Sequence, residues 1–138
     1  MSEPKQVIVM RKDLNMRKGK MVAQGSHASM GALLSLMKKY KDETTMLGKT
    51  KNWLLAAPEN GPIAYWLENS FAKICVSVES EQELLDIYQK AVDIRIPCVL
   101  ITDSGRTEFN GVPTNTCCGI GPWWPDIINE ITGKLKLL

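Results

Sequence analysis

The sequence predicts a single α/β domain, spanning residues 1–138, with a mostly parallel sheet. Strand-like apolar runs alternate along the chain with helix-like segments, which is typical of an α/β layer fold. Apolar residues make up 44% of the chain and charged residues 23%, ordinary proportions for a globular protein. A chain of 138 residues can bury a substantial core as one domain.

Four strands are expected from short apolar runs rich in β-branched residues. They are residues 5–10 (KQVIVM), 71–78 (FAKICVSV), 97–102 (PCVLIT) and 116–121 (TCCGIG). The tail KLKLL is compatible with an edge strand. Loops at 11–19, 79–80 and 103–115 follow the first three strands. Sites in α/β folds gather at such carboxyl ends of strands, beside helix N-termini.

Three helices are expected between these strands, at residues 19–40, 80–93 and 125–132. Ser80 is the expected N-cap of the second helix, with Glu83 three residues later completing a capping box. Pro125 suits the first turn of the third helix. Residues 41–70 are expected to form two short helices around a turn at 60–62.

Charge is unevenly distributed, although the net charge is only +2. Residues 1–20 contain six basic and two acidic residues, and residues 79–93 contain one basic and five acidic residues. One part of the surface is therefore expected to attract a polyanion and another to repel it.

Neither a signal peptide nor a membrane span is predicted, because the longest N-terminal apolar run, Val7 to Met10, is too short. The four cysteines form no pattern of metal ligands. They are expected to be small buried apolar residues in a reducing compartment, which favours the cytoplasm.

The first predicted helix has a narrow polar stripe. At 100° per residue the stripe is about 80° wide, and it consists of Lys20, Gln24, His27, Gly31, Ser35 and Lys38. Nearly all other positions are apolar or small, so this helix is expected to be covered by the sheet and by another helix or a second subunit. A positive helix N-terminus beside Lys18 and Lys20 indicates an anion site. The alternative is a solvated stripe with an incidental histidine.

The loop TDSGRTEFNGVPTNT follows the third predicted strand. Asp103 lies at the end of this strand, and Gly105 permits a tight turn. Arg106 can bind a phosphate with its guanidinium fork, and Thr107 offers a hydroxyl. The alternative is an ordinary polar turn.

The runs VIVMRKDLNMRKGKMVAQGSHA, DSGRTE and TCCGIGP together resemble the peptidyl-tRNA hydrolases of the archaeal and eukaryotic type. The resemblance covers residues 5–40 and 71–138. It implies a mixed four-stranded sheet flanked by helices on both faces, and a homodimer. It also implies hydrolysis of the ester that joins a peptide to the 3′-terminal ribose of tRNA, without metal or cofactor.

The same resemblance assigns activity to Lys20, Gln24, Asp103 and Thr107. Lys20 or Gln24 can stabilise an oxyanion, and Asp103 can either accept a proton from water or orient it. A second group is expected to contact the tRNA end and comprises Lys12, Lys18, His27, Arg106 and Thr116.

Two rival functions remain open at this point. One is a non-catalytic RNA-binding or adaptor protein on the same fold, against which Asp103 argues because a carboxylate repels phosphate. The other is an enzyme that cleaves a different acyl ester or amide.

Two segments depart from the family pattern. Residues 41–70 are longer than expected and contain basic residues, with Trp53 able either to stack on a base or to lie in the core. In GPWWP, Trp123 and Trp124 replace small residues, and they can narrow the site or cover an apolar face.

Overall fold

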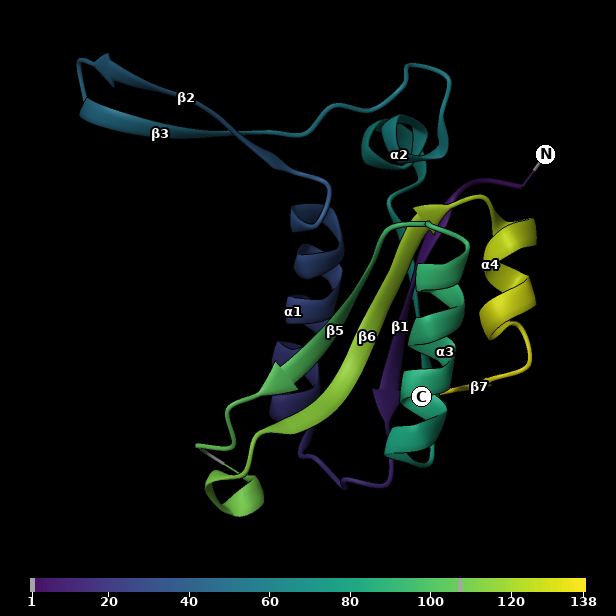
Figure 1. Cartoon of the computed structure of the whole chain (residues 1–138). Coiled ribbons are helices and arrows are strands. Elements are labelled where there is room, and N and C mark those ends of the chain that lie inside the picture. The colour runs from purple at the N-terminus through teal and green to yellow at the C-terminus, as the bar shows by residue number, and fades with distance from the viewer. Residues whose placement is uncertain (1, 107) are drawn as a thin grey trace.

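A five-stranded mixed sheet forms the body of the protein in the computed structural model, which describes residues 2–106 and 108–138 (Figure 1). The strands are β1 (Lys5–Arg11), β4 (Ala72–Val78), β5 (Cys98–Asp103), β6 (Thr114–Trp123) and β7 (Lys136–Leu137). Their order is β5-β6-β1-β4-β7. The tail is thus an edge strand, as predicted, and pairs with β4.

The expectation of a mostly parallel sheet is wrong, whereas the mixed sheet that the resemblance implies is confirmed, with the tail added to the four expected strands. The sheet has a fifth strand, β7, and only β1 and β4 run parallel. β6 is antiparallel to both β1 and β5. The reason is the connection between β5 and β6, which spans only residues 104–113. A loop of this length can reverse the chain, whereas a parallel pair needs a crossover of a dozen residues or more.

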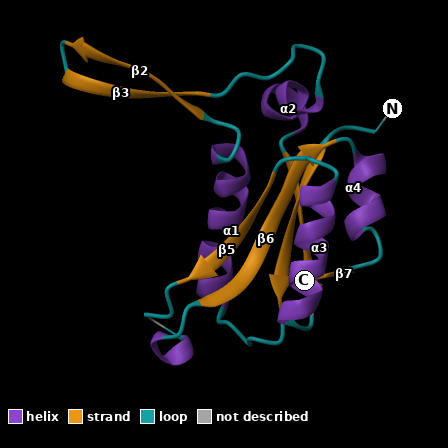
Figure 2. Ribbon diagram, in the orientation of Figure 1, coloured by secondary structure: helices purple, strands orange, loops and turns teal. Residues whose placement is uncertain are grey.

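Helices cover both faces of the sheet, as predicted (Figure 2). One face carries α1 (Lys18–Leu34), and the other carries α3 (Glu81–Asp93) and α4 (Pro125–Thr132). The period-two alternation of β1 supplies both cores. Val7 and Val9 pack with residues of α3 and α4, whereas Ile8 and Met10 pack on the side of α1.

The two helices on the far face begin as predicted. The Ser80 hydroxyl accepts a 3.1 Å hydrogen bond from the Glu83 backbone N–H. The Glu83 carboxylate in turn accepts a 2.8 Å bond from the backbone N–H of Glu79, one residue before the expected capping-box partner. Pro125 lies in the first turn of α4.

The segment after α1 differs most from prediction. The helix ends at Leu34 rather than at residue 40, and β2 (Lys38–Thr45) and β3 (Gly48–Leu54) form an antiparallel hairpin. Tyr40 and the three threonines of the hairpin favour strands, and Gly48 supplies a positive φ of 95° at the turn. The first expected short helix is therefore absent. The second is present as α2 (Pro62–Tyr65), which continues into a wider π-type turn at Trp66–Ser70.

An apolar groove of about 790 Å³ lies beside α1, on the part of the sheet face that α1 leaves uncovered. Ile8, Met30 and Trp66 are among the residues that line it. The prediction that one side of α1 packs on the sheet is confirmed, but Val22 (69% exposed) and Met30 (58%) face solvent within this chain. Cys75 also lines the groove and is exposed, whereas Cys117 and Cys118 are buried as expected.

Within the described parts of the chain, none of the helices has both the length and the apolar character that crossing a membrane requires.

Candidate active site

Lys20, in the first turn of α1, and Asp103, the last residue of β5, form the centre of the site. The Lys20 Nζ lies 2.9 Å from the Asp103 Oδ1, and each side chain is only 13% exposed. The amide Nε2 of Gln24, one helical turn after Lys20, donates to the same oxygen at 3.1 Å. An ammonium and an amide therefore converge on one carboxylate oxygen, at the end of the strand where Asp103 was expected.

Thr116 connects this cluster to the middle of the sheet. Its hydroxyl donates a 2.6 Å bond to the Gln24 Oε1, and both residues are buried. This bond sets the orientation of the Gln24 amide, because the oxygen faces Thr116 and the nitrogen must then face Asp103. Thr116 is therefore a positioning residue beneath the site rather than an exposed contact for substrate.

The second oxygen of Asp103 is held by its own loop. The Gly105 backbone N–H donates to Asp103 Oδ2 at 2.8 Å. Gly105 has a φ of +83°, and a Cβ at this position would lie 2.3 Å from the backbone oxygen of Val112. Only glycine fits, so the predicted tight turn is confirmed and serves to fix the carboxylate.

These contacts lower the pKa of Asp103. The hydrogen bond from Lys20 is the largest cause, and it outweighs the partial burial that acts in the opposite direction. Asp103 is thus ionised at neutral pH and is a weak proton acceptor. A carboxylate has about four acceptor positions, and the bonds from Lys20, Gln24 and Gly105 use three of them.

Four other predicted site residues lie on the surface of the protein, and one of them, Lys18, lines the apolar groove beside α1. Lys12, Lys18, His27 and Arg106 are exposed. The first turn of α1 contains no acidic residue, which keeps its N-terminus positive. The ring of Phe109 lies 5.7 Å from the Lys20 Nζ and forms one wall. Thr107 lies outside the described residues.

The polar stripe of α1 does not face solvent as a whole. Gln24 is buried against β6, and Gly31 packs on Val99 of β5. A Cβ on Gly31 would approach Val99 to 3.1 Å. The stripe therefore faces the β5 edge of the sheet, and this is why Lys20 and Gln24 meet Asp103. His27, on the same stripe, remains exposed.

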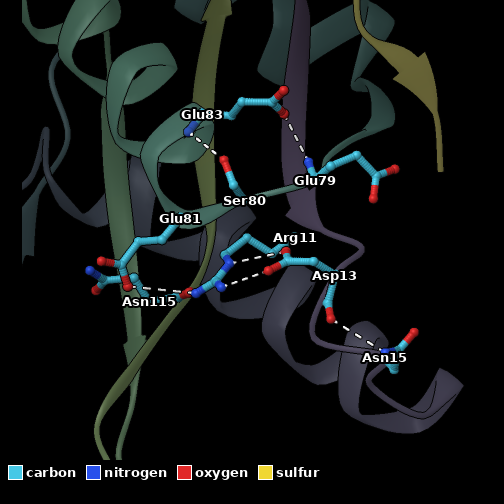
Figure 3. A network of polar contacts seen from close by, with 8 residues as sticks. All are labelled: Arg11, Asp13, Asn15, Glu79, Ser80, Glu81, Glu83 and Asn115. Atoms are coloured by element: carbon cyan, nitrogen blue, oxygen red, sulfur yellow. Dashed lines mark hydrogen bonds and ion pairs between the residues drawn. The ribbon is translucent and has the colours of Figure 1, made fainter.

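Arg11 is a residue that the sequence did not single out, although it organises the loop before α1 (Figure 3). Its guanidinium binds both carboxylate oxygens of Asp13, at 3.2 and 2.8 Å, and the backbone oxygen of Asn115 at 3.0 Å. Glu81 lies 3.6 Å away. The loop that leads into Lys20 is thereby tied to the residue next to Thr116. The contact between Arg11 and Asn115 joins residues 104 positions apart in the sequence, so no local pattern predicts it.

The two tryptophans of GPWWP lie away from the site. Asp103 pairs with Thr114 at one end of β6, whereas Trp123 is at the other end and packs against the core beneath α3 and α4. Trp123 therefore covers an apolar face and does not narrow the site. Trp124 precedes α4 at that same distant end.

The site thus consists of a carboxylate held by an ammonium and an amide, close to a helix N-terminus that has no acidic residue in its first turn. In the portion of the chain that the structure describes, no cluster of His, Cys, Asp and Glu is arranged to hold a metal. Residues 4–138 match the family described as peptidyl-tRNA hydrolase PTH2. The chain belongs to this family.

Curated relatives agree with this membership. A peptidyl-tRNA hydrolase of Methanocaldococcus jannaschii is 42% identical over 134 residues, which cover 97% of this chain and 99% of the relative. One from Sulfurisphaera tokodaii is 38% identical, with 97% and 98% covered. The predicted family is confirmed, and the range that matches the family includes residues 41–70. None of these findings supports the non-catalytic alternative.

Proposed function

We propose that this protein hydrolyses the ester between a peptide and the 3′-terminal ribose of tRNA, and so recycles tRNA from stalled translation. The observation that carries the proposal is the bonded cluster of Lys20, Gln24 and Asp103 in a chain that matches the PTH2 family over residues 4–138. We take the chain as one hydrolase domain over residues 1–138, acting in the cytoplasm, where translation occurs.

The chemistry requires an oriented water and a donor for the developing oxyanion. Lys20 and Gln24 are the donors, and one such donor contributes about 3–4 kcal/mol to transition-state stabilisation. The lowered pKa of Asp103 favours a role in orienting Lys20 and the attacking water over that of a general base. Thr107 is assigned to hold the water or the ribose. This mechanism uses no cofactor.

Binding of the tRNA end is assigned to the exposed cations around the cluster. Lys12, Lys18 and Arg106 bind phosphates, with His27 at the rim. Phosphate contacts carry little sequence information. They therefore suit an enzyme that acts on every peptidyl-tRNA through its common 3′ end.

The apolar groove beside α1 is assigned to a second copy of the chain. Val22 and Met30 leave apolar surface exposed there. Gly25 and Ser29 also line the groove, and their small side chains would allow a second copy to approach closely. A homodimer would bury this apolar surface.

The direct test is to incubate the purified protein with N-acetylaminoacyl-tRNA and with free aminoacyl-tRNA, beside the Lys20→Ala and Asp103→Ala variants. Release of the acetylated amino acid by the wild type, lost in both variants, is the expected result. Salt-sensitive tRNA binding without release would overturn the enzyme assignment and support the adaptor. Equal activity on esters that lack tRNA would support the third possibility.

A further inference from the structure

The hairpin formed by β2 and β3 stands away from the body of the protein. It projects from the C-terminal end of α1, the end opposite Lys20 (Figure 1). Among the described residues, its two strands contact each other extensively and make no comparably extensive contact with another element. Isolated two-stranded hairpins are at best marginally stable in water. A hairpin that projects in this way contributes little to the core, so its use lies in what it contacts.

The hairpin carries the excess positive charge of the chain. Residues 38–54 contain five lysines against Asp42 and Glu43, a net charge of +3. Since the whole chain has a net charge of +2, the remainder is slightly negative. The basic character is thus concentrated on this arm and around the N-terminus of α1.

The strand register gathers much of this charge on one face. Lys39 pairs directly with Trp53. Side chains alternate along a strand, so Lys49 and Lys51 lie on the same face of β3 as Trp53. All four side chains are exposed, and Trp53 is 57% exposed. Lysines around an accessible indole are the elements of a single-strand or loop RNA-binding surface, in which the cations bind phosphates and the ring stacks on a base.

The opposite face is mixed rather than apolar. It carries Lys38 and Tyr40 of β2 with Asn52 and Leu54 of β3. The exposed apolar residues are thus divided between two faces and the turn at Met46 and Leu47. A surface that binds a protein partner is expected to present a continuous apolar patch, which the hairpin does not. Its positive charge instead favours a polyanion.

The chain that leads from the catalytic cluster to the hairpin has no acidic side chain that would repel RNA. No acidic residue occurs in residues 14–41, which include all of α1. The 17 residues of α1 span about 25 Å at 1.5 Å per residue, equivalent to roughly eight stacked base pairs at about 3 Å each. A tRNA whose 3′ end enters the site is long enough to reach the hairpin.

We propose that the face of the hairpin formed by Lys39, Lys49, Lys51 and Trp53 is a second RNA-binding surface, which holds the body of the tRNA while its 3′ end occupies the Lys20–Asp103 site. This inference rests on the proposed function. It assigns to the hairpin the part of tRNA recognition that lies beyond the 3′ end.

The first test measures binding of deacylated tRNA, without any hydrolysis, over a range of salt concentrations. The test variant is Lys39→Gln/Lys49→Gln/Lys51→Gln. The matched control is Lys90→Gln/Lys134→Gln/Lys136→Gln, which removes the same charge from exposed lysines outside the hairpin. The hairpin variant is expected to bind at least tenfold more weakly, with the slope of log affinity against log salt reduced by about 2 to 3. Equal effects of the two triple variants would overturn the proposal.

Trp53 is tested separately, because stacking depends on the ring and not on charge. Trp53→Ala is expected to weaken tRNA binding about tenfold, with the salt slope unchanged, and Trp53→Tyr is expected to retain most of the affinity. A change in oligomeric state by light scattering, with tRNA affinity unaltered, would show instead that the hairpin binds protein and would overturn the proposal.

A second readout separates this proposal from the hydrolase assignment. The lysine variant is compared with wild type on N-acetylaminoacyl-tRNA and on the same acyl group carried by a CCA trinucleotide, which is too short to reach the hairpin. The loss on tRNA is expected to exceed the loss on the trinucleotide by about tenfold, mainly in KM. Equal losses would indicate damage at the active site and overturn the hairpin surface. If wild type cleaves neither substrate, the hydrolase assignment fails, whereas the binding measurement still decides on the hairpin.

Discussion

The hydroxyl of Thr116 and the side-chain oxygen of Gln24 lie 2.6 Å apart, and both residues are buried. This contact determines which end of the Gln24 amide faces Asp103. A residue of the central sheet thereby controls the donor arrangement at the sheet edge, without itself reaching the surface. A substitution at Thr116 therefore tests the orientation of the Gln24 amide separately from the residues that contact Asp103.

Replacing Thr116 by valine keeps the shape of the side chain and removes the hydroxyl. We expect kcat to fall about 10- to 100-fold, because the amide can turn and misplace its N–H. The buried Gln24 oxygen also loses its donor, which costs about 1–3 kcal/mol of unfolding free energy. Thr116→Ser is the control and is expected to restore both quantities substantially. Unchanged kcat in the valine variant, with the fold intact, would contradict this role.

The pH dependence of Asp103 gives a second prediction. Its pKa is lowered in the native protein, mainly by the Lys20 hydrogen bond. The associated stability is therefore complete above the ordinary aspartate pKa of about 3.9 and is lost as the pH falls through the lowered native value. In Lys20→Met the pKa of Asp103 is expected to rise. Titration of the Asp103 carboxyl carbon by NMR measures this directly, and identical midpoints in the two proteins would refute the coupling.

Sequence reasoning predicted the parts of the site that depend on local pattern. Helical spacing put Lys20 and Gln24 on one stripe, and the end of a strand drew attention to Asp103, whereas their part in the activity was implied by the family resemblance. The same wheel did not decide whether the polar stripe of α1 faces solvent or a polar edge of the sheet, because an amphipathic pattern does not distinguish the two. Gln24 is buried, and the apolar Val22 is exposed. Burial depends on packing partners far away in the sequence.

Strand direction and the hairpin were missed for similar physical reasons. The antiparallel course of β6 follows from the loop at 104–113, whose length matters more than the composition of the strand. Residues 38–45 contain lysines that suit a helix as well as a strand, and the pairing of Lys39 with Trp53 forms only across the hairpin turn. Trp53, for which a core position was one of the two expectations, is exposed, whereas Trp66 of the same segment is fully buried.

The apolar groove yields a third prediction. Val22→Glu places a charge in the groove that we assign to a second copy, and it is expected to shift the protein to monomer in light scattering at micromolar concentration. Ile94→Glu is the matched control, because Ile94 is also exposed (47%) but lies outside the groove lining. Equal dimer content in both variants would remove the groove from the interface.

The loop that holds Asp103 supports the last prediction, a comparison of two glycines. Gly105→Ala places a Cβ 2.3 Å from the Val112 backbone oxygen at a φ of +83°. We expect a loss of about 1–3 kcal/mol in unfolding free energy and a fall in kcat, because the loop must move and take the Asp103 Oδ2 contact with it. Gly19→Ala is the control in the first turn of α1, where an added Cβ has no neighbour within 4 Å among the described residues. Alanine there is expected to be neutral, or stabilising by up to about 1 kcal/mol. Chemical denaturation and single-turnover hydrolysis measure the two effects. If Gly105→Ala loses stability but keeps kcat, then the Gly105 N–H stabilises the loop without contributing to the position of the Asp103 carboxylate that the reaction would require.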